Sequence, residues 1–180
     1  MQGFIWMGTK DGLNRYDGYN FRTYKHLLND TTSMSDNEIL SLSSDQNGNI
    51  YISTQGGGFN KFIYNTNEFI RYPQLPISEP TVNTVYPAAD GSIWIGTPEG
   101  LILGEPIEEE PNQYRFTNLS KNSAYLNIGG QILPYDRKMM AVHAILPIEE
   151  NYMLIGTQNG IFIYNTQEKN FSAASVNTQI

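Results

Sequence analysis

The sequence contains no cysteine and only two histidines among its 180 residues. The absence of cysteine excludes disulfide bonds, thiolate metal sites and a cysteine nucleophile, but it leaves the redox compartment undecided. A serine nucleophile elbow, a phosphate-binding glycine loop and a His-Glu-x-x-His zinc helix are absent from the sequence as well. We therefore expect a chain that is not itself an enzyme and that holds no metal and no cofactor.

Positive charge is also scarce, since 11 Lys and Arg stand against 18 Asp and Glu, a formal net charge of −7. Nucleic acids and anionic membrane surfaces both require a basic surface, so we expect neither as a partner. No apolar run approaches the roughly 20 residues that span a bilayer. No signal peptide precedes the first repeat, which begins at Gln2. The chain is then either cytosolic or a piece of a longer protein, and we favour the second.

The sequence does contain a repeat. A large apolar residue, a second apolar residue, Gly or Ser, and Thr recur four times, and each copy is followed closely by glycine and another apolar run. The marker threonines are 45, 43 and 60 residues apart. A period of roughly 40–50 residues with several short strands is typical of β-propeller blades. The prediction is an all-β propeller of about four four-stranded antiparallel meanders. The four copies lie at 6–9, 51–54, 94–97 and 154–157.

The second copy predicts the blade in most detail. Its strands are expected at 37–43, 49–54, 59–63 and 68–72, with turns rich in Asp, Asn and Gly between them. Second strands are apolar on both faces, as expected for a blade between two neighbours. The small residue of the tetrad should allow blades to approach closely, and its threonine should support the next turn. Trp6 and Trp94 are interpreted as packing between blades rather than as ligand platforms. The blades are placed at 1–26, 35–73, 80–118 and 140–174.

The ends of the chain do not coincide with blade boundaries. The first blade lacks its innermost strand, and residues 175–180 resemble the start of another inner strand, as at 35–39 and 81–85. This tail could complete the first blade and close a small ring. Alternatively, a homodimer pools eight blades through the blade faces, because an open arc would expose two apolar faces.

Residues 3–17, Gly-Phe-Ile-Trp-Met-Gly-Thr-Lys-Asp-Gly-Leu-Asn-Arg-Tyr-Asp, resemble the two-component regulator propeller repeat. The pattern continues through 21–24, 33–39 and 45–48. The resemblance implies the extracytoplasmic sensor region of a membrane histidine kinase, many of which are hybrid systems of Bacteroides-type bacteria that sense glycan breakdown products. It therefore implies a periplasmic fragment without the kinase parts, and an oligosaccharide as a possible ligand. The signature residues themselves build blades.

The third interval is about 16 residues longer than the others, which places an inserted loop at 105–139. Functional sites favour such loops. Tyrosine rings stack on sugars and guanidinium groups donate to hydroxyls or carboxylates. The candidate ligand-binding residues are Tyr125, Tyr135, Arg137 and Lys138 in the loop, with His143 on an inner strand that could line a central channel. The alternatives are a divergent loop that shields a blade edge, and a His143 in ordinary packing.

Three other features are interpreted structurally. His26 follows an outer strand and is expected at the surface. The acidic run 108–110 lies between prolines and is expected in a solvated loop. The segment 45–49 is expected to be a turn, since it lacks the later glutamate of a calcium loop.

Three functions remain open on the sequence. The first is a non-catalytic sensor module for an oligosaccharide or similar ligand. The second is a structural or protein–protein interaction propeller without a small-ligand site. The third is a propeller lyase that uses a histidine and a metal.

Overall fold

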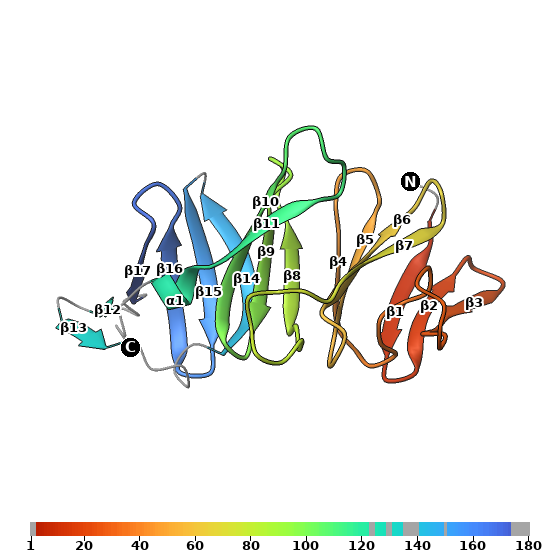
Figure 1. Ribbon diagram of the computed structural model, residues 1–180, viewed down its shortest axis with the longest axis horizontal. Coiled ribbons are helices and arrows are strands. Elements are labelled where there is room, and N and C mark those ends of the chain that lie inside the picture. Colours follow the sequence, from red (N-terminus) through yellow and green to blue (C-terminus); the bar gives the residue numbers. More distant parts are fainter. Residues whose placement is uncertain (1–2, 123–124, 129–130, 135–140, 150, 174–180) are drawn as a thin grey trace.

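The computed structural model describes residues 3–122, 125–128, 131–134, 141–149 and 151–173 (Figure 1). The described chain is built of strands, apart from the single-turn helix α1 (Leu119–Asn122). The strands form four sheets that stand side by side as propeller blades. The predicted all-β propeller fold is confirmed.

Each blade is a meander in which consecutive strands pair antiparallel. The first contains β1 (Ile5–Thr9), β2 (Gly12–Tyr16) and β3 (Phe21–Tyr24). The second contains β4 (Ile39–Ser44), β5 (Ile50–Thr54), β6 (Phe59–Ile63) and β7 (Glu68–Tyr72). The third contains β8 (Thr84–Pro87), β9 (Ile93–Thr97), β10 (Gly100–Pro106) and β11 (Tyr114–Asn118). The fourth contains β14 (Val142–Glu149), β15 (Tyr152–Thr157), β16 (Gly160–Asn165) and β17 (Asn170–Ala173).

The core consists of three apolar clusters, one at each junction between consecutive blades. Both tryptophans pack across a junction: Trp6 lies 5.2 Å from Phe62, and Trp94 lies 5.6 Å from Tyr164, between ring centroids. Every residue of β5 and β9 is buried, because their blades have a neighbour on each face. Strand β1 is partly exposed, because its blade has a neighbour on one face only.

The tetrad residues act as the sequence predicts. A Cβ atom added to Gly96 would lie 2.7 Å from side-chain atoms of both Thr84 and Val142, so only glycine permits this blade contact. The hydroxyl of Thr97 donates to the carbonyl of Gly100 at 2.9 Å and accepts from the amide of Glu99 at 3.1 Å. The other three marker threonines hold their turns in the same way.

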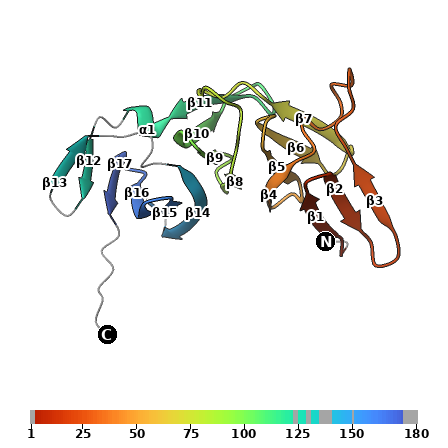
Figure 2. The same cartoon turned by 90° about the horizontal axis from the view of Figure 1, so that it is seen from below.

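The blades follow an open arc rather than a ring (Figure 2). Among the described residues β1 pairs only with β2, and β14 pairs only with β15. The closed four-blade ring, one of the two predicted arrangements, is therefore not what these residues form. Residues 175–180, which were to close it, lie outside the described residues.

The segment predicted as an inserted loop at 105–139 contains regular structure, and this is a correction. It includes the outer strand β11, helix α1 and the hairpin of β12 (Tyr125–Ile128) and β13 (Gln131–Pro134). Strand β12 adds to the fourth sheet by a parallel pairing with β17. In the sequence, short apolar runs on both sides of a Gly-Gly pair favour such a hairpin.

Candidate functional site

The largest of the described cavities lies between the third and fourth blades and has a volume of about 750 Å³. This size falls within the range of small-molecule sites. Its apolar wall comes from strands of both blades: Tyr86 on β8, Trp94 and Leu103 from the third blade, and Met153 and Tyr164 from the fourth. A ligand here would contact both blades at once.

The aromatic part of the cavity follows from the repeat. Tyr86 is the cross-strand neighbour of Trp94, so the two side chains lie on the same face of the third sheet. Trp94 and Tyr164 meet edge to face across the blade junction. Trp94 and Tyr164 are buried, whereas Tyr86 is half-buried, so Tyr86 offers the more accessible ring.

Acidic residues surround this wall. Asp90 occupies the turn between β8 and β9, Glu105 is the penultimate residue of β10, and Glu149 ends β14; all three are exposed and line the cavity. One carboxylate oxygen of Asp90 accepts from the amide and hydroxyl of Ser92, at 2.9 and 2.7 Å, which fixes its position. In the part of the chain that the structure describes, neither Glu105 nor Glu149 forms an ion pair. Their oxygens are available to accept hydrogen bonds.

Lys169 is the one cation among the residues that line this cavity. Burial raises the pKa of Tyr164, so its phenol stays protonated across the physiological range. No group of three or more His, Asp and Glu side chains that could hold a metal ion occurs among the described residues. The arrangement therefore suits binding: aromatic rings for an apolar face and several acceptors for hydroxyl groups.

The predicted site residues are placed only in part. Tyr125 begins β12, and its side chain lies outside the described residues, as do Tyr135, Arg137 and Lys138. His143 lies on β14 with an exposed side chain, so the interpretation of His143 as a packed residue is wrong. His143 does not line any of the three described cavities. These five residues stay a prediction.

The inserted segment nevertheless reaches the cavity. Glu105, Thr117 and Leu119 contribute to its lining, and all three belong to the long third interval or to its flank. The hydroxyl of the buried Ser120 accepts from the amide of Leu101 at 3.0 Å and anchors α1 on β10. The anchor explains why this stretch stays beside the blade junction.

The sequence reasoning missed Tyr86, Asp90 and Glu149. One signal could have indicated the junction: the pentapeptide Phe-Ile-Tyr-Asn-Thr occurs at 62–66 and again at 162–166. Its tyrosine faces the preceding blade at both places, since Tyr164 meets Trp94 and Tyr64 shares a cavity with Trp6. A cavity therefore lies at the junction between the first and second blades and at the equivalent junction between the third and fourth blades.

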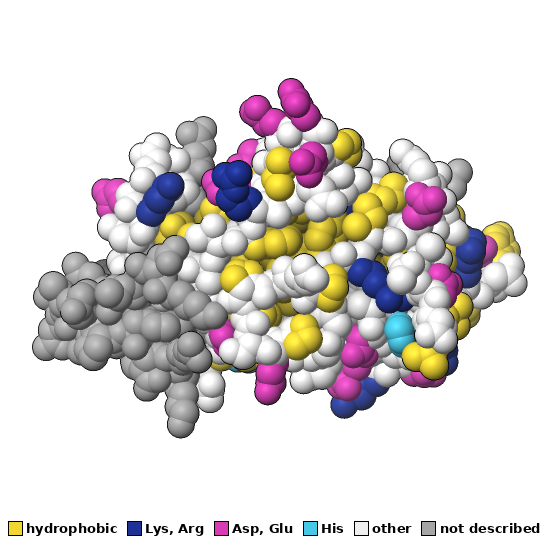
Figure 3. All heavy atoms as spheres, viewed as in Figure 1, with side chains coloured by type: hydrophobic (Ala, Val, Ile, Leu, Met, Phe, Trp, Pro, Cys, Tyr) yellow, Lys and Arg dark blue, Asp and Glu magenta, His cyan; other side chains and the backbone are white. Residues whose placement is uncertain are grey.

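The other sequence motifs are structural. The carboxylate of Asp45 accepts from the amides of Asn47 and Asn49, at 2.9 Å each, which makes the expected turn. Residues 108–110 are exposed at the tip of the β10–β11 hairpin, where acidic side chains are visible in Figure 3. His26 is half-buried, and its Nδ1 lies 2.7 Å from the carbonyl oxygen of Met34.

Sequence comparison identifies the repeat. The family model described as "Two component regulator propeller" matches residues 33–56. Histidine kinase P4 of Formosa agariphila is 48% identical over 33 residues, which are 18% of this chain and 2% of that protein. The chain therefore carries a repeat of the two-component regulator propeller type.

Structural comparison gives the same fold. The extracellular domain assigned to a hybrid two component system of B. thetaiotaomicron superposes with a TM-score of 0.74 at 23% identity, covering 97% of this chain and 23% of that one. A second such domain gives 0.69 at 20% identity, with 95% and 23% covered. An ancestral GH74 enzyme gives 0.61 at 10% identity, with 97% and 22% covered. At these identities the likeness shows the propeller fold, and the chain spans about a quarter of each domain.

Proposed function

We propose that this chain, which carries a two-component regulator propeller repeat, is a non-catalytic ligand-sensing part of the periplasmic propeller of a sensor kinase. Its ligand is an oligosaccharide or a similarly hydroxyl-rich molecule. The matched repeat and the shared fold with extracellular domains of hybrid two component systems support the sensor context. No helix in the described part of the chain is long and apolar enough to cross a membrane.

The observation that carries the ligand class is the composition of the cavity between the third and fourth blades. A sugar ring presents a C–H face that stacks on an aromatic ring, and its hydroxyls donate to carboxylates. Tyr86 offers the half-buried ring, and Glu105 and Glu149 offer oxygens that no ion pair occupies in the described chain. A volume of about 750 Å³ is sufficient for a short oligosaccharide.

The position of the cavity gives a route from binding to signalling. The two blades that form it are separate sheets joined by the segment that contains α1. A ligand that contacts both β8 and β14 favours one relative position of the blades over others, because it shifts the population toward the state it binds best. The inferred signal is this shift in blade position.

A second candidate function is an interaction propeller, and the ends of the arc favour it. Ile5 and Phe21 are exposed on the outer face of the first blade, at 57% and 65%. Leu146 and Ile161 are exposed on the fourth blade, at 56% and 47%. Exposed apolar groups of this kind mark interaction surfaces.

The test is calorimetric titration of the chain with a panel of neutral oligosaccharides of different linkage. Tyr86→Ala is expected to weaken binding of any positive sugar about tenfold, because an aromatic contact contributes on the order of 1 kcal/mol beyond burial. Glu149→Gln tests whether the carboxylate of Glu149 accepts hydrogen bonds from the hydroxyls of the sugar. Tyr19→Ala is the matched control, since Tyr19 is 91% exposed in the turn between β2 and β3.

Two results would contradict the proposal. In one, a folded sample gives no heat with any sugar of the panel, which leaves the interaction propeller as the better function. In the other, binding occurs but is unchanged in both Tyr86→Ala and Glu149→Gln, which moves the site elsewhere.

A further inference from the structure

Two arginines lie side by side on the face of the first blade that points toward the second. Arg15 on β2 and Arg22 on β3 are direct cross-strand partners. Leu13 and Tyr24, two residues away on the same strands, pack into the cluster between these blades. Residues two apart on a strand share a face, so both arginines lie on the face toward this junction, where Arg15 is half-buried and Arg22 is exposed. Like charges directly opposite each other are destabilising, so their placement needs a reason.

Carboxylates of the protein do not provide that reason. The ion pairs of the described residues join Lys10 to Glu38 and Lys25 to Asp11, so neither arginine takes part in one. The charge of Arg15 contributes the smallest part of the lowering of the pKa of Asp17, most of which comes from backbone hydrogen bonds. Neither guanidinium donates a hydrogen bond to another described residue.

Aromatic rings hold the two guanidinium groups. Arg15 Cζ lies 4.4 Å from the ring centroid of Phe4 and 5.9 Å from that of Trp6. Arg22 Cζ lies 4.9 Å from the ring centroid of Tyr24. Such contacts orient a guanidinium while its N–H groups remain able to donate.

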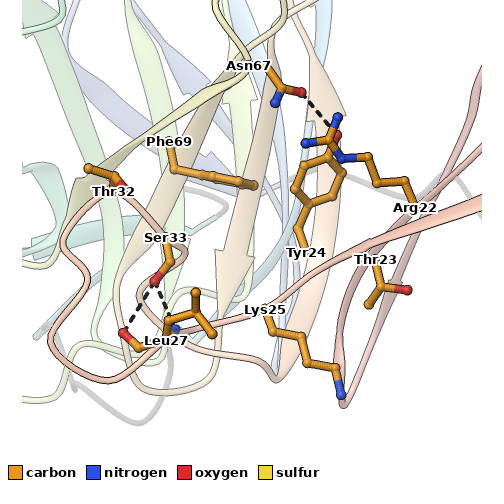
Figure 4. A pocket seen from close by; sticks show the side chains of 9 residues that line it. All are labelled: Arg22, Thr23, Tyr24, Lys25, Leu27, Thr32, Ser33, Asn67 and Phe69. Carbon is orange, nitrogen blue, oxygen red and sulfur yellow. Dashed lines mark hydrogen bonds between the residues drawn. The ribbon is translucent and has the colours of Figure 1, made fainter.

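Two cavities lie at this junction: Arg22 lines the first, and Phe4 and Trp6, the rings that contact Arg15, line the second. One, of about 380 Å³, is lined by Arg22, Lys25 and Asn67 together with the rings of Tyr24 and Phe69 (Figure 4). In that figure the Arg22 guanidinium lies next to Asn67, whose Oδ1 accepts from the Tyr24 hydroxyl at 3.1 Å.

The second cavity has a volume of about 370 Å³. Its lining includes Phe4, Trp6, Tyr64 and Asn65. Asn65 and Asn67 belong to the turn between β6 and β7, so the two cavities flank one turn. Aromatic rings, side-chain amides and guanidinium donors are therefore present at one blade junction.

We propose that the junction between the first and second blades binds an anionic saccharide, with its carboxylate or sulfate group on Arg15 and Arg22. Guanidinium groups match both oxyanions in a bidentate geometry. The neighbouring rings take the sugar face, and the amides of Asn65 and Asn67 take hydroxyls. This site is separate from the cavity between the third and fourth blades and does not depend on it.

The two tryptophans make the sites separately measurable, because Trp6 lines a cavity at the first junction and Trp94 lines the cavity between the third and fourth blades. Trp94→Phe leaves Trp6 as the reporter for the proposed anion site. This variant is titrated with D-glucuronate, D-glucose 6-sulfate, D-glucose and sodium sulfate while Trp6 fluorescence is recorded. We expect a saturable change with one or both anionic sugars and at least tenfold weaker binding of glucose. Binding is also expected to weaken from about 50 to about 300 mM NaCl, since screening acts on charge contacts.

Substitutions test whether Arg15 and Arg22 make the contact with the anionic group of the sugar. The double variant Arg15→Gln and Arg22→Gln is expected to lose at least tenfold in affinity for the anionic sugar. Arg115→Gln is the matched control, since Arg115 is an exposed arginine on β11 of the third blade and lines neither cavity of the first junction. Calorimetry of the unsubstituted chain and of the double variant with the same probes gives a readout independent of the tryptophan substitution.

Each outcome has a defined meaning. Binding of glucuronate alone supports the carboxylate form, and binding of glucose 6-sulfate alone supports the sulfate ester. Equal binding of glucose, equal binding of sodium sulfate, unchanged affinity in the double variant, or a folded protein without response would each overturn the proposal. Trp6→Phe, which keeps Trp94, reports the other cavity, so failure here is distinguishable from failure of the sensing function above.

Discussion

At the scale of single residues, blade contacts depend on side chains that are missing or small. Gly8, Ser53 and Gly96 occupy one position of the repeat, and each faces the next blade. An added Cβ at Gly8 would lie 2.5 Å from Ile39 on β4. At Ser53 the hydroxyl instead lies 3.3 Å from the carbonyl oxygen of Asn83 in the third blade. The spacing between blades is therefore set at this position.

Gly96→Ala should destabilise the chain by about 1–3 kcal/mol, because overpacking forces Thr84 and Val142 apart. The matched control is Gly156→Ala in the fourth blade, where the nearest atom to an added Cβ is Ala144 of the same blade at 3.2 Å. Urea denaturation measures both. Equal losses in the two variants would contradict a role in blade spacing.

The free energy that each marker threonine contributes to stability is expected to depend on how deeply its hydroxyl is buried. Thr54→Val removes a buried hydroxyl that donates to the carbonyl of Gly58 at 2.8 Å and accepts from the amide of Gly57 at 3.1 Å. The loss should be about 1–3 kcal/mol, because the buried amide of Gly57 loses this partner, while the carbonyl of Gly58 keeps the hydrogen bond from the amide of Thr54 at 3.1 Å. Thr157→Val should cost less, since water can replace the hydroxyl at that exposed turn. Thermal unfolding gives the midpoint temperature of each variant. A larger decrease of this temperature for Thr157→Val than for Thr54→Val would contradict the explanation.

Sequence reasoning worked for these residues because their roles are local and recur in every blade. It did not find Asp90, Glu149 or the Arg15–Arg22 pair as site residues. Each of these occurs once, and its significance depends on which strand lies opposite it in the next blade. The spacing of residues within one blade does not indicate which residues of two neighbouring blades come into contact.

At the scale of elements, the β10–β11 hairpin binds the second and third blades together. Lys61 on β6 donates to the side-chain oxygen of Asn112 at 2.9 Å, and the hydroxyl of Tyr72 on β7 donates to the carbonyl of Asn112 at 2.8 Å. Lys61 is buried, and this burial lowers its pKa. Tyr51 and Tyr114 lie beside it, and burial raises the pKa of both, as it does for Tyr72.

The raised tyrosine pKa values predict a loss of stability in alkali. Below about pH 10 the Tyr72 phenol is protonated in both the folded and the unfolded chain, so it contributes no pH dependence. Above that pH the unfolded chain releases the proton while the folded chain keeps it, so the unfolding free energy falls. The limiting slope is about 1.4 kcal/mol per pH unit for each such tyrosine.

Urea denaturation between about pH 9 and about pH 11 measures this slope. Tyr72→Phe should lower the unfolding free energy at neutral pH, because it loses one hydrogen bond, yet its alkaline slope should be shallower. Tyr19→Phe is the control, since Tyr19 is exposed. A Tyr72→Phe slope equal to that of the unsubstituted chain would show that Tyr72 ionises normally.

The predicted strands of the second blade agree closely with β4 to β7, because alternating apolar residues and turn residues mark them. The segment 105–139 was less predictable. Hairpin β12–β13 has no counterpart in the other copies, and its parallel pairing with β17 joins residues far apart in the sequence. The repeat pattern therefore could not predict this hairpin, because the hairpin is not part of the repeat.

At the scale of the whole molecule, no other described element covers the outer face of the first blade or the outer face of the fourth. Isoleucine, leucine and phenylalanine side chains are exposed on these faces. We propose that the isolated chain covers them by association with a second copy, since burial of apolar surface is the main favourable term in such contacts. Light scattering should then give twice 20.3 kDa.

Phe21→Lys and Ile161→Lys, one on each end face, should shift this association toward the monomer. Leu28→Lys is the control, since Leu28 is 84% exposed in the segment between the first and second blades. A monomer of 20.3 kDa at every concentration of the unsubstituted chain would contradict a dimer through the blade faces.

The measurement that tests the proposed sensing function most directly is a two-dimensional ¹H–¹⁵N spectrum recorded with and without a neutral oligosaccharide from the panel. The two indole N–H signals, of Trp6 and Trp94, report on the two hollow junctions. A saturable shift of the Trp94 signal, with Trp6 unchanged and with loss of the shift in Tyr86→Ala, is the predicted result. A sugar that binds by calorimetry without moving the Trp94 signal would contradict recognition in the cavity between the third and fourth blades.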